Sequence, residues 1–362
     1  MTVSNNALKT ITAYKQYSEM LDMPSAQRSV VKDDYPTRLA AAPASLTQAR
    51  RDAVVKGRNL SGPLSSAQLD EFERKGFLFI PNLISGEELE ALRDEMTLLM
   101  NNQAYRDQEF SITEPESHDI RSLFAVHRLS KRLAQLACDE RLAGAARQIV
   151  GDDPYVHQSR INYKPGFAGK GFNWHSDFET WHAEDGMPNM HAVSASLILT
   201  DNHEFNGPLM LIPGSHLEFV PCLGETPEDN HKSSLKAQKV GVPSPEALTQ
   251  LVAKYGIEAP KGKAGGLLLF DCNTLHASNA NLSPDPRSNV FFVFNRPDNR
   301  CVAPFAAPKQ RPSFLAHEPD DRWTPDAGRR TPDAGRRTPD AGRRTPDAGR
   351  RTHSLRYPLW YK

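Results

Sequence analysis

The stretch FNWHSDFETWHAEDGMP, residues 172–188, concentrates side chains that can bind a metal or transfer protons. It holds two histidines, two aspartates, two glutamates and two tryptophans in 17 residues. Residues i and i+2 of an extended strand point to the same side, so His175 and Asp177 would present an imidazole and a carboxylate together. Two ligands alone do not make a metal site, so a solvated polar loop and a core histidine with acidic neighbours remain open.

A third ligand is offered by GGLLLFDCNTLHASN, residues 265–279, an apolar run whose polar end carries His276, about 100 residues after His175. Two histidines and one carboxylate form the facial triad of non-haem Fe(II) oxygenases, in which the other coordination positions stay open. Arg287 follows eleven residues later, and its guanidinium could grip the carboxylate of an oxo-acid bidentately. The spacing and the strand-rich surroundings therefore predict an Fe(II) oxygenase that uses 2-oxoglutarate and O2 as cosubstrates.

Other histidines compete for a role. His182 and Glu179 could bind zinc together with His175, but no second dense cluster and no nearby thiolates support such a site. His216 ends an apolar run at the tight turn PGSH, which favours a structural role. His157 is interpreted as a packed or surface residue.

The segment YVHQSRINYKP, residues 155–165, has one wholly polar face if it is a strand. The residues at every second position on that face are Gln158, Arg160, Asn162 and Lys164. Such a face either contacts solvent at a sheet edge or lines a barrel interior in which a ligand needs hydrogen-bond donors. The pattern alone does not decide between the two.

The elements that must position these residues divide into a helical front and a β-rich remainder. Capping-box spacing predicts helices that begin after Ser65 and Ser85, and a third helical stretch covers about 129–149. Short apolar segments with turn residues predict strands in the run 76–84, which Pro81 closes, and at 155–165, 191–201, 208–216, 265–279 and 288–296. The fold class is therefore mainly β with flanking helices, as a jelly roll or cupin-like barrel.

Three domains are expected. Residues 1–60 form a polar lead-in that is partly disordered, 61–315 form the dioxygenase domain, and 316–362 form a disordered tail. Within the domain, the polar segment 222–262 reads as a long insertion, with a helix near 244–254, that could act as a lid. The tail repeats TPDAGRR four times at 324–351, and units with Pro, Gly and only one weakly apolar residue cannot bury a face.

Composition excludes several classes of protein. The 362 residues have a formal net charge of +0, which argues against a nucleic-acid partner or an anionic membrane surface. No apolar run is long enough to span a membrane, and the first residues lack the apolar region of a secretory signal. The four cysteines lie far apart and are read as reduced thiols, so a cytoplasmic protein is expected.

The motif FNWHSDFETWHAEDGMP, together with DNHEFNGPLMLIPGSH, closely resembles the ectoine hydroxylase family of the phytanoyl-CoA-dioxygenase-like Fe(II)/2-oxoglutarate oxygenases. The resemblance runs from DDYPTR at 33 to PKQRPSF at 308–314, and leaves out the first 32 residues and the repeats. It implies a double-stranded β-helix, a homodimer, and hydroxylation of the compatible solute ectoine to 5-hydroxyectoine, a product that protects against osmotic and heat stress.

The resemblance also implies roles for single residues. Iron is held by His175, Asp177 and His276, and 2-oxoglutarate by Lys164 and Arg287. The residues matched to substrate-binding positions are Gln158, Trp181, Ser196, Phe294 and Arg311. Ectoine is a small ring with an amidinium and a carboxylate, so Trp181 suits the cation and Arg311 suits the carboxylate.

Two alternatives stay open. The same chemistry could act on another small zwitterion such as proline, although Gln158 and Trp181 argue against it. A non-enzymatic, cupin-like metal-binding module is the other, and it would have no need for Arg287 or Lys164 and would not bind 2-oxoglutarate.

Overall fold

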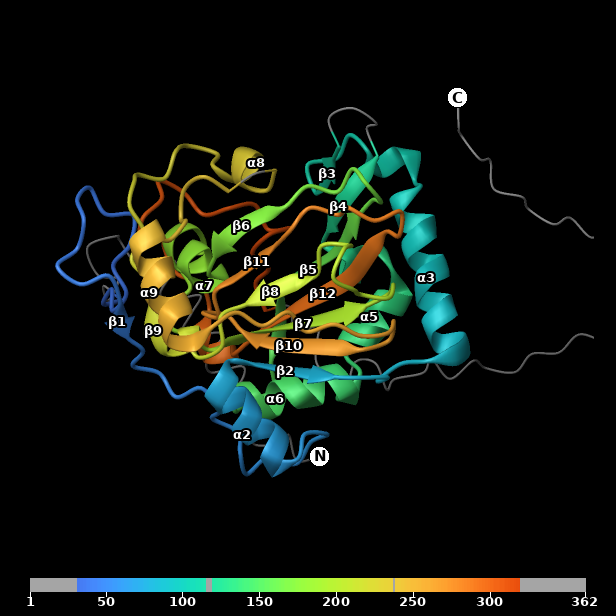
Figure 1. Ribbon diagram of the computed structural model, residues 1–362, viewed down its shortest axis with the longest axis horizontal. Coiled ribbons are helices and arrows are strands. Elements are labelled where there is room, and N and C mark those ends of the chain that lie inside the picture. The colour runs from blue at the N-terminus through green and yellow to red at the C-terminus, as the bar shows by residue number, and fades with distance from the viewer. Residues whose placement is uncertain (1–30, 115–118, 237, 320–362) are drawn as a thin grey trace, which may run out of the picture.

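Two antiparallel sheets form the centre of the computed structural model, which describes residues 31–114, 119–236 and 238–319 (Figure 1). The larger sheet has seven strands in the order β2-β10-β7-β12-β5-β4-β3, and the smaller has three in the order β6-β11-β8. A further pair, β1 and β9, lies apart from them. The predicted jelly roll with flanking helices is confirmed.

The strands are β1 (Gln48–Ala49), β2 (Phe77–Ile80), β3 (Ser111–Thr113), β4 (Ile120–Phe124), β5 (Tyr155–Lys164), β6 (Phe172–His175), β7 (Ala192–Ile198), β8 (Leu209–Leu211), β9 (Glu218–Phe219), β10 (Leu267–Asp271), β11 (His276–Ser278) and β12 (Arg287–Asn295). The α-helices are α2 (Ser66–Lys75), α3 (Gly86–Met100), α4 (Val126–Leu129), α5 (Lys131–Ala137), α6 (Ala145–Val150), α7 (Asp177–Thr180), α8 (His231–Ser234) and α9 (Pro245–Tyr255). The 3-10 and π-helical turns are η2 (Gln103–Tyr105), η3 (Glu140–Gly144), η4 (Trp181–Asp185), η5 (Ser215–Leu217) and η6 (Pro297–Asn299).

The larger sheet has two different faces because successive strand residues alternate. On β12, Val290, Phe292 and Phe294 join the main hydrophobic core with residues of α2, α3, α5 and α6. These helices lie along one side of the sheet (Figure 1). Each fully buried side chain of this size contributes about 1.5–3 kcal/mol by leaving water. The opposite face is thereby left for the space between the two sheets.

The two predicted helix starts are confirmed, but only one has the full capping box. Ser65 accepts a hydrogen bond from the Gln68 backbone while the Gln68 side chain accepts one from the Ser65 backbone. Ser85 makes no such bond. The Glu88 carboxylate pairs instead with Arg141, 53 residues away, so a tertiary ion pair replaces the local cap.

Two long predicted elements are each divided. The stretch 129–149 becomes α5, η3 and α6, because the Asp139 side chain accepts from the Arg141 backbone and starts a new helical turn. The stretch 265–279 becomes β10 and β11, which belong to different sheets. Between them Asp271 accepts from the Asn273 and Thr274 backbones, and this turn redirects the chain into the smaller sheet.

Residues 31–60 are more ordered than expected, since Tyr35 and Arg38 are buried against the β-structure. The expectations for residues 1–30 and for the TPDAGRR repeats fall outside the described residues. Among the helices that the structure describes, none combines the length and the apolar character that a membrane crossing requires. All four cysteines are unpaired thiols, as expected.

Candidate functional site

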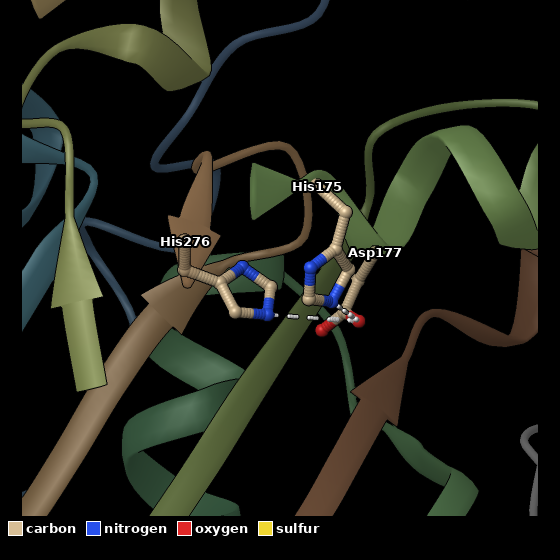
Figure 2. A group of neighbouring side chains, drawn as sticks. All are labelled: His175, Asp177 and His276. Carbon is tan, nitrogen blue, oxygen red and sulfur yellow. Dashed lines mark ion pairs between the residues drawn. The ribbon is translucent and has the colours of Figure 1, made fainter. Parts of the chain in front are cut away.

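His175, Asp177 and His276 converge between the two sheets (Figure 2). One ligand atom from each lies within 4.8 Å of the other two. The Asp177 Oδ1 atom is 3.8 Å from His175 Nε2 and 3.9 Å from His276 Nε2. Two imidazole nitrogens and one carboxylate oxygen at these separations fit around a single ion and leave one side of it open.

The triad is positioned by three neighbouring pieces of chain. His175 ends β6 and lies directly opposite His276 on β11 in the antiparallel pairing. The sequence pattern predicted that Asp177 would continue the strand of His175. Instead, Asp177 is the first residue of α7. Ser176 caps that helix by accepting from the Glu179 backbone, so the chain turns at the residue between the two ligands. A turn into a helix, rather than an extended strand, therefore brings the His175 and Asp177 side chains together.

Backbone carbonyls orient both imidazoles. His175 Nδ1 lies 2.8 Å from the Asn173 carbonyl oxygen, and His276 Nδ1 lies 2.9 Å from that of Thr274. A carbonyl can only accept, so each Nδ1 carries the proton and each Nε2 keeps its lone pair for a metal. The two histidines are thus held in the tautomer that a metal ligand requires.

The charge states also suit a divalent cation. Burial, and next the neighbouring His276, lowers the pKa of His175 to about 3, so its imidazole is neutral near neutrality. Burial alone would raise the pKa of Asp177, but the charges of His276 and Arg160 outweigh it and hold that pKa below its usual value. The site therefore offers an anionic carboxylate from Asp177 and a neutral imidazole from His175.

The triad lies in a cavity lined mainly by β5, by α7 with η4, and by residues of β11 and β12. The predicted site residues among its lining are Gln158, Lys164, His175, Asp177, Trp181, His276, Arg287 and Arg311. The polar face of β5 lines this cavity as well, which decides between the two interpretations of that strand. Residues 234, 235 and 238 of the long insertion also contribute to the wall.

Lys164 and Arg287 lie directly opposite each other in the β5–β12 pairing. Among the described residues, no carboxylate lies within 4 Å of either cation, and the buried Arg287 Nε has no hydrogen-bond partner. Burial lowers the pKa of Arg287 to about 10, and burial followed by the Arg287 charge lowers that of Lys164 to about 7. Two like charges at opposed positions destabilise the sheet, so this arrangement calls for an anion.

Gln158 and Trp181 both line the cavity, and Gln158 also contacts the C-terminal segment, residues 306–317. The Gln158 side chain donates to the Leu315 carbonyl at 2.8 Å and accepts from Arg160. Trp181 is almost wholly buried and belongs to a small core cluster, with part of its surface in the cavity lining.

Ser196 and Phe294 are not among the residues that line the cavity. Ser196 accepts a hydrogen bond of 2.9 Å from Asn289. Phe294 faces the helices with Val290 and Phe292, because the alternation along β12 places these three on the side opposite Phe291. The predicted contact of Phe294 with substrate thus conflicts with its position in the core.

Thr180 and Glu184 are among the lining residues to which the sequence gave no role, and Arg160 was named only as part of the polar face of β5. The Arg160 guanidinium lies over the Phe291 ring, 4.5 Å from its centroid. Thr180 and Glu184 follow Asp177 by three and seven residues. This is helical spacing, so a helix predicted to begin at Asp177 would have placed both residues on the same face as Asp177.

The alternative metal set does not assemble. Glu179 is bound by Arg38, and the two nitrogens of His182 lie 2.8 Å from the Met187 carbonyl oxygen and 3.0 Å from Asp33 Oδ1. His216 is buried and lies 3.0 Å from the Glu73 carbonyl oxygen, which fits the structural role predicted for it. Within the described part of the chain, the triad is the one group of histidine, cysteine or acidic side chains whose ligand atoms lie close enough together to hold a metal ion.

Comparison with known proteins agrees with this geometry. The model of the phytanoyl-CoA dioxygenase family matches residues 72–289. An ectoine dioxygenase of Halomonas elongata is 69% identical over 296 residues, which are 82% of this chain and 89% of the relative.

Two crystal structures of EctD from S. alaskensis are similar to this fold, each with 43% sequence identity and a TM-score of 0.71. One has 2-oxoglutarate and 5-hydroxyectoine bound, and the match covers 80% of this chain and 96% of that one. The other has bound Fe, with 80% and 95% covered. Because the family match spans more than half of the sequence and includes the whole triad, the chain belongs to the phytanoyl-CoA dioxygenase family.

Proposed function

We propose that this protein is a 2-oxoglutarate-dependent dioxygenase that hydroxylates ectoine to 5-hydroxyectoine. One observation carries the proposal: the triad opens into a cavity whose opposed cations, Lys164 and Arg287, have no carboxylate of a described residue within 4 Å. Relatives at up to 69% identity are ectoine dioxygenases, and a similar structure holds 2-oxoglutarate and 5-hydroxyectoine. The balanced reaction is ectoine, 2-oxoglutarate and O2 giving 5-hydroxyectoine, succinate and CO2.

His175, Asp177 and His276 would hold the iron, and their donor set of two nitrogens and one oxygen fits Fe(II). When bound, Fe(II) supplies the oxidative chemistry that couples decarboxylation of 2-oxoglutarate to hydroxylation. Arg287 and Lys164 would bind a carboxylate of 2-oxoglutarate. Their charges orient the cosubstrate and gain an anionic partner in the same event.

The substrate would lie between Trp181, Gln158 and Arg311, all of which line the cavity. An indole face attracts a delocalised cation with about 0.5–2 kcal/mol, depending on desolvation. Gln158 can fix the ring by a hydrogen bond, and the Arg311 guanidinium suits the carboxylate. We propose substrate contacts for these cavity residues and not for Phe294.

The experiment that tests the proposal compares small zwitterions. Iron-loaded protein with 2-oxoglutarate and O2 is given ectoine or proline, and succinate release is measured against a reaction without substrate. Stimulation by ectoine well above that by proline is expected. Greater stimulation by proline would replace the substrate, and the lack of any 2-oxoglutarate binding would favour the non-enzymatic metal-binding module.

The affinity for 2-oxoglutarate is expected to fall as the pH rises above 7. The pKa of Lys164 is about 7 in the ligand-free protein, so its ammonium is progressively lost above that pH, and binding an anion then requires proton uptake. Arg287 and Arg121 also face Lys164, but arginines keep their charge up to about pH 9 here.

Anaerobic titration of iron-loaded protein with 2-oxoglutarate between pH 6 and 9 checks this prediction. The limiting slope is about tenfold per pH unit. Lys164→Met is expected to bind more weakly and to lose the dependence. An equal slope in the wild type and in that variant would contradict the assignment.

Deletion of residues 324–351 is expected to leave turnover within about twofold of the full chain, because units with so little apolar surface bury nothing. The measurement is the specific activity of the full chain and of the truncated protein at saturating ectoine. A large loss in the truncated protein would make the repeats part of the working enzyme.

We propose residues 61–315 as the catalytic domain. Tyr35 and Arg38 show that part of the lead-in also packs on it.

We further propose that the protein acts as a cytoplasmic homodimer in the production of a stress-protective solute. Four unpaired cysteines support a reducing compartment. Three exposed apolar side chains, Phe167, Phe205 and Leu282, lie on adjacent loops joined by backbone hydrogen bonds, which supports a contact between copies. Sedimentation equilibrium at twice the monomer mass is the expected result, and a monomer would contradict it.

A further inference from the structure

Behind the cavity, Asp185 and Arg311 form a bidentate ion pair. Arg311 Nε lies 2.6 Å from Asp185 Oδ1, and Arg311 Nη2 lies 2.6 Å from Asp185 Oδ2. Both side chains are almost wholly buried. Burial lowers the pKa of Arg311, but the Asp185 carboxylate outweighs that effect and holds it above the usual value. The pair therefore stays charged, and two parallel bonds fix the plane of the guanidinium.

This pair leaves the remaining edge of the guanidinium unused. Arg311 belongs to the cavity lining, and its Nη1 makes no hydrogen bond to another described residue. A planar fork that is held by two of its nitrogens presents the third in one direction only. The direction in which Arg311 can donate to a ligand is thus set by Asp185.

The Asp185 carboxylate also lies beside His157, the residue whose ring packs against Trp181. His157 Nε2 is 3.4 Å from Asp185 Oδ2, and the His157 and Trp181 rings pack edge to face with centroids 5.4 Å apart. His157 is completely buried. The His157 ring thus lies between the carboxylate and the aromatic wall of the cavity and acts by packing, since neither of its ring nitrogens has a hydrogen-bond partner among the described residues.

The surrounding backbone holds this arrangement together. The Gln310 side chain donates to the Asp185 carbonyl at 2.8 Å, and Ala306 donates from its backbone to the Ala183 carbonyl at 3.0 Å. The backbone of His317 donates to the His157 carbonyl at 2.8 Å. Strand β5, turn η4 and the C-terminal segment therefore meet at one carboxylate.

We infer that Asp185 is a positioning residue, which aims Arg311 at the carboxylate of the substrate and, through His157, keeps Trp181 against the substrate cation. This inference rests on the proposed function, since it gives a role to a residue behind the same site. Asp185 touches neither substrate nor metal ligands. Its effect is to fix the distance between Arg311 and Trp181, the two groups that contact the carboxylate and the cation of a small zwitterion.

The test is the affinity for ectoine of protein loaded with Fe(II) and 2-oxoglutarate, measured anaerobically by calorimetry. In Asp185→Asn, an amide N–H group faces the guanidinium in place of one oxygen, so Arg311 is turned away. We expect a dissociation constant for ectoine roughly 10- to 100-fold higher than in the wild type. Affinity for 2-oxoglutarate should change less than about twofold, because Lys164 and Arg287 lie elsewhere.

A double-mutant cycle separates positioning from general damage. Because Asp185 acts chiefly through Arg311, adding D185N to Arg311→Met should raise the dissociation constant much less than D185N alone does, and the remainder measures the route through His157 and Trp181. Glu179→Gln is the matched control, since Glu179 on the same helical stretch is held bidentately by buried Arg38 at 2.6 and 2.9 Å but does not line the cavity. It should lower the melting temperature and leave ectoine affinity unchanged.

Ectoine affinity of D185N within twofold of the wild type, or additive effects in the cycle, would overturn the inference. So would an equal loss of ectoine affinity in E179Q. Should D185N not fold, Asp185→Glu and His157→Phe carry the same test, with smaller losses of ectoine affinity expected in both. Wild-type protein that binds 2-oxoglutarate but not ectoine would instead remove the proposed substrate.

Discussion

His175→Ala is expected to lower ectoine hydroxylation at least about 10³-fold and to abolish stoichiometric iron binding. The imidazole is one of three ligands, and its Nε2 lone pair is preset by the bond from Nδ1 to the Asn173 carbonyl. With only Asp177 and His276 left, the ion has two protein ligands in place of three and exchanges with solvent. Iron content after desalting and initial rates of 5-hydroxyectoine formation are the measurements.

His203→Ala is the matched control, because His203 lies near the surface and outside the cavity lining. It should keep both iron and activity. A H175A protein that retains one iron per chain and hydroxylates ectoine at more than about a tenth of the wild-type rate would contradict the assignment of the triad.

Arg287→Ala is expected to weaken 2-oxoglutarate binding by about 100-fold or more, because removing one partner of a buried charge pair is this costly. The buried Arg287 Nε has no protein partner, so the guanidinium is available to a ligand. Arg287→Lys keeps a charge but loses the planar fork, and an intermediate loss of about tenfold is expected. Anaerobic titration of the iron-loaded protein measures both.

Arg50→Lys supplies the comparison. The Arg50 side chain is also buried, but it pairs with Asp271 at 2.8 Å and lies outside the cavity lining. Its substitution should lower thermal stability while the affinity for 2-oxoglutarate stays constant. If R287A bound 2-oxoglutarate as tightly as the wild type, the anion would have to be held elsewhere in the cavity.

Much of the site could be predicted because its residues follow simple periodic rules. The alternation along residues 155–164 placed Gln158 and Lys164 on one face, and that face lines the cavity. The same rule, applied to residues 287–294, would have shown that Phe294 shares a face with Val290 and Phe292 rather than with Arg287. The family resemblance suggested that Phe294 contacts substrate, whereas the alternation along the strand places it on the opposite face.

Other features depend on contacts that no local pattern encodes. The fork between Asp185 and Arg311 joins residues 126 positions apart, and that between Arg38 and Glu179 joins residues 141 apart. Both meet at a short helical stretch that the sequence presents as a dense run of charges. Only the fold decides that these three carboxylates have two different roles, Asp177 as a candidate metal ligand and Glu179 and Asp185 as partners of buried arginines.

The most direct test of the account is the ratio of 5-hydroxyectoine to succinate formed in one reaction. Iron-loaded protein is mixed anaerobically with 2-oxoglutarate and ectoine, O2 is admitted, and both products are quantified over time. We expect the two products to form together in a ratio close to one, because both compounds are proposed to bind beside the same triad. Succinate that accumulates without 5-hydroxyectoine would contradict the assignment of ectoine as the substrate.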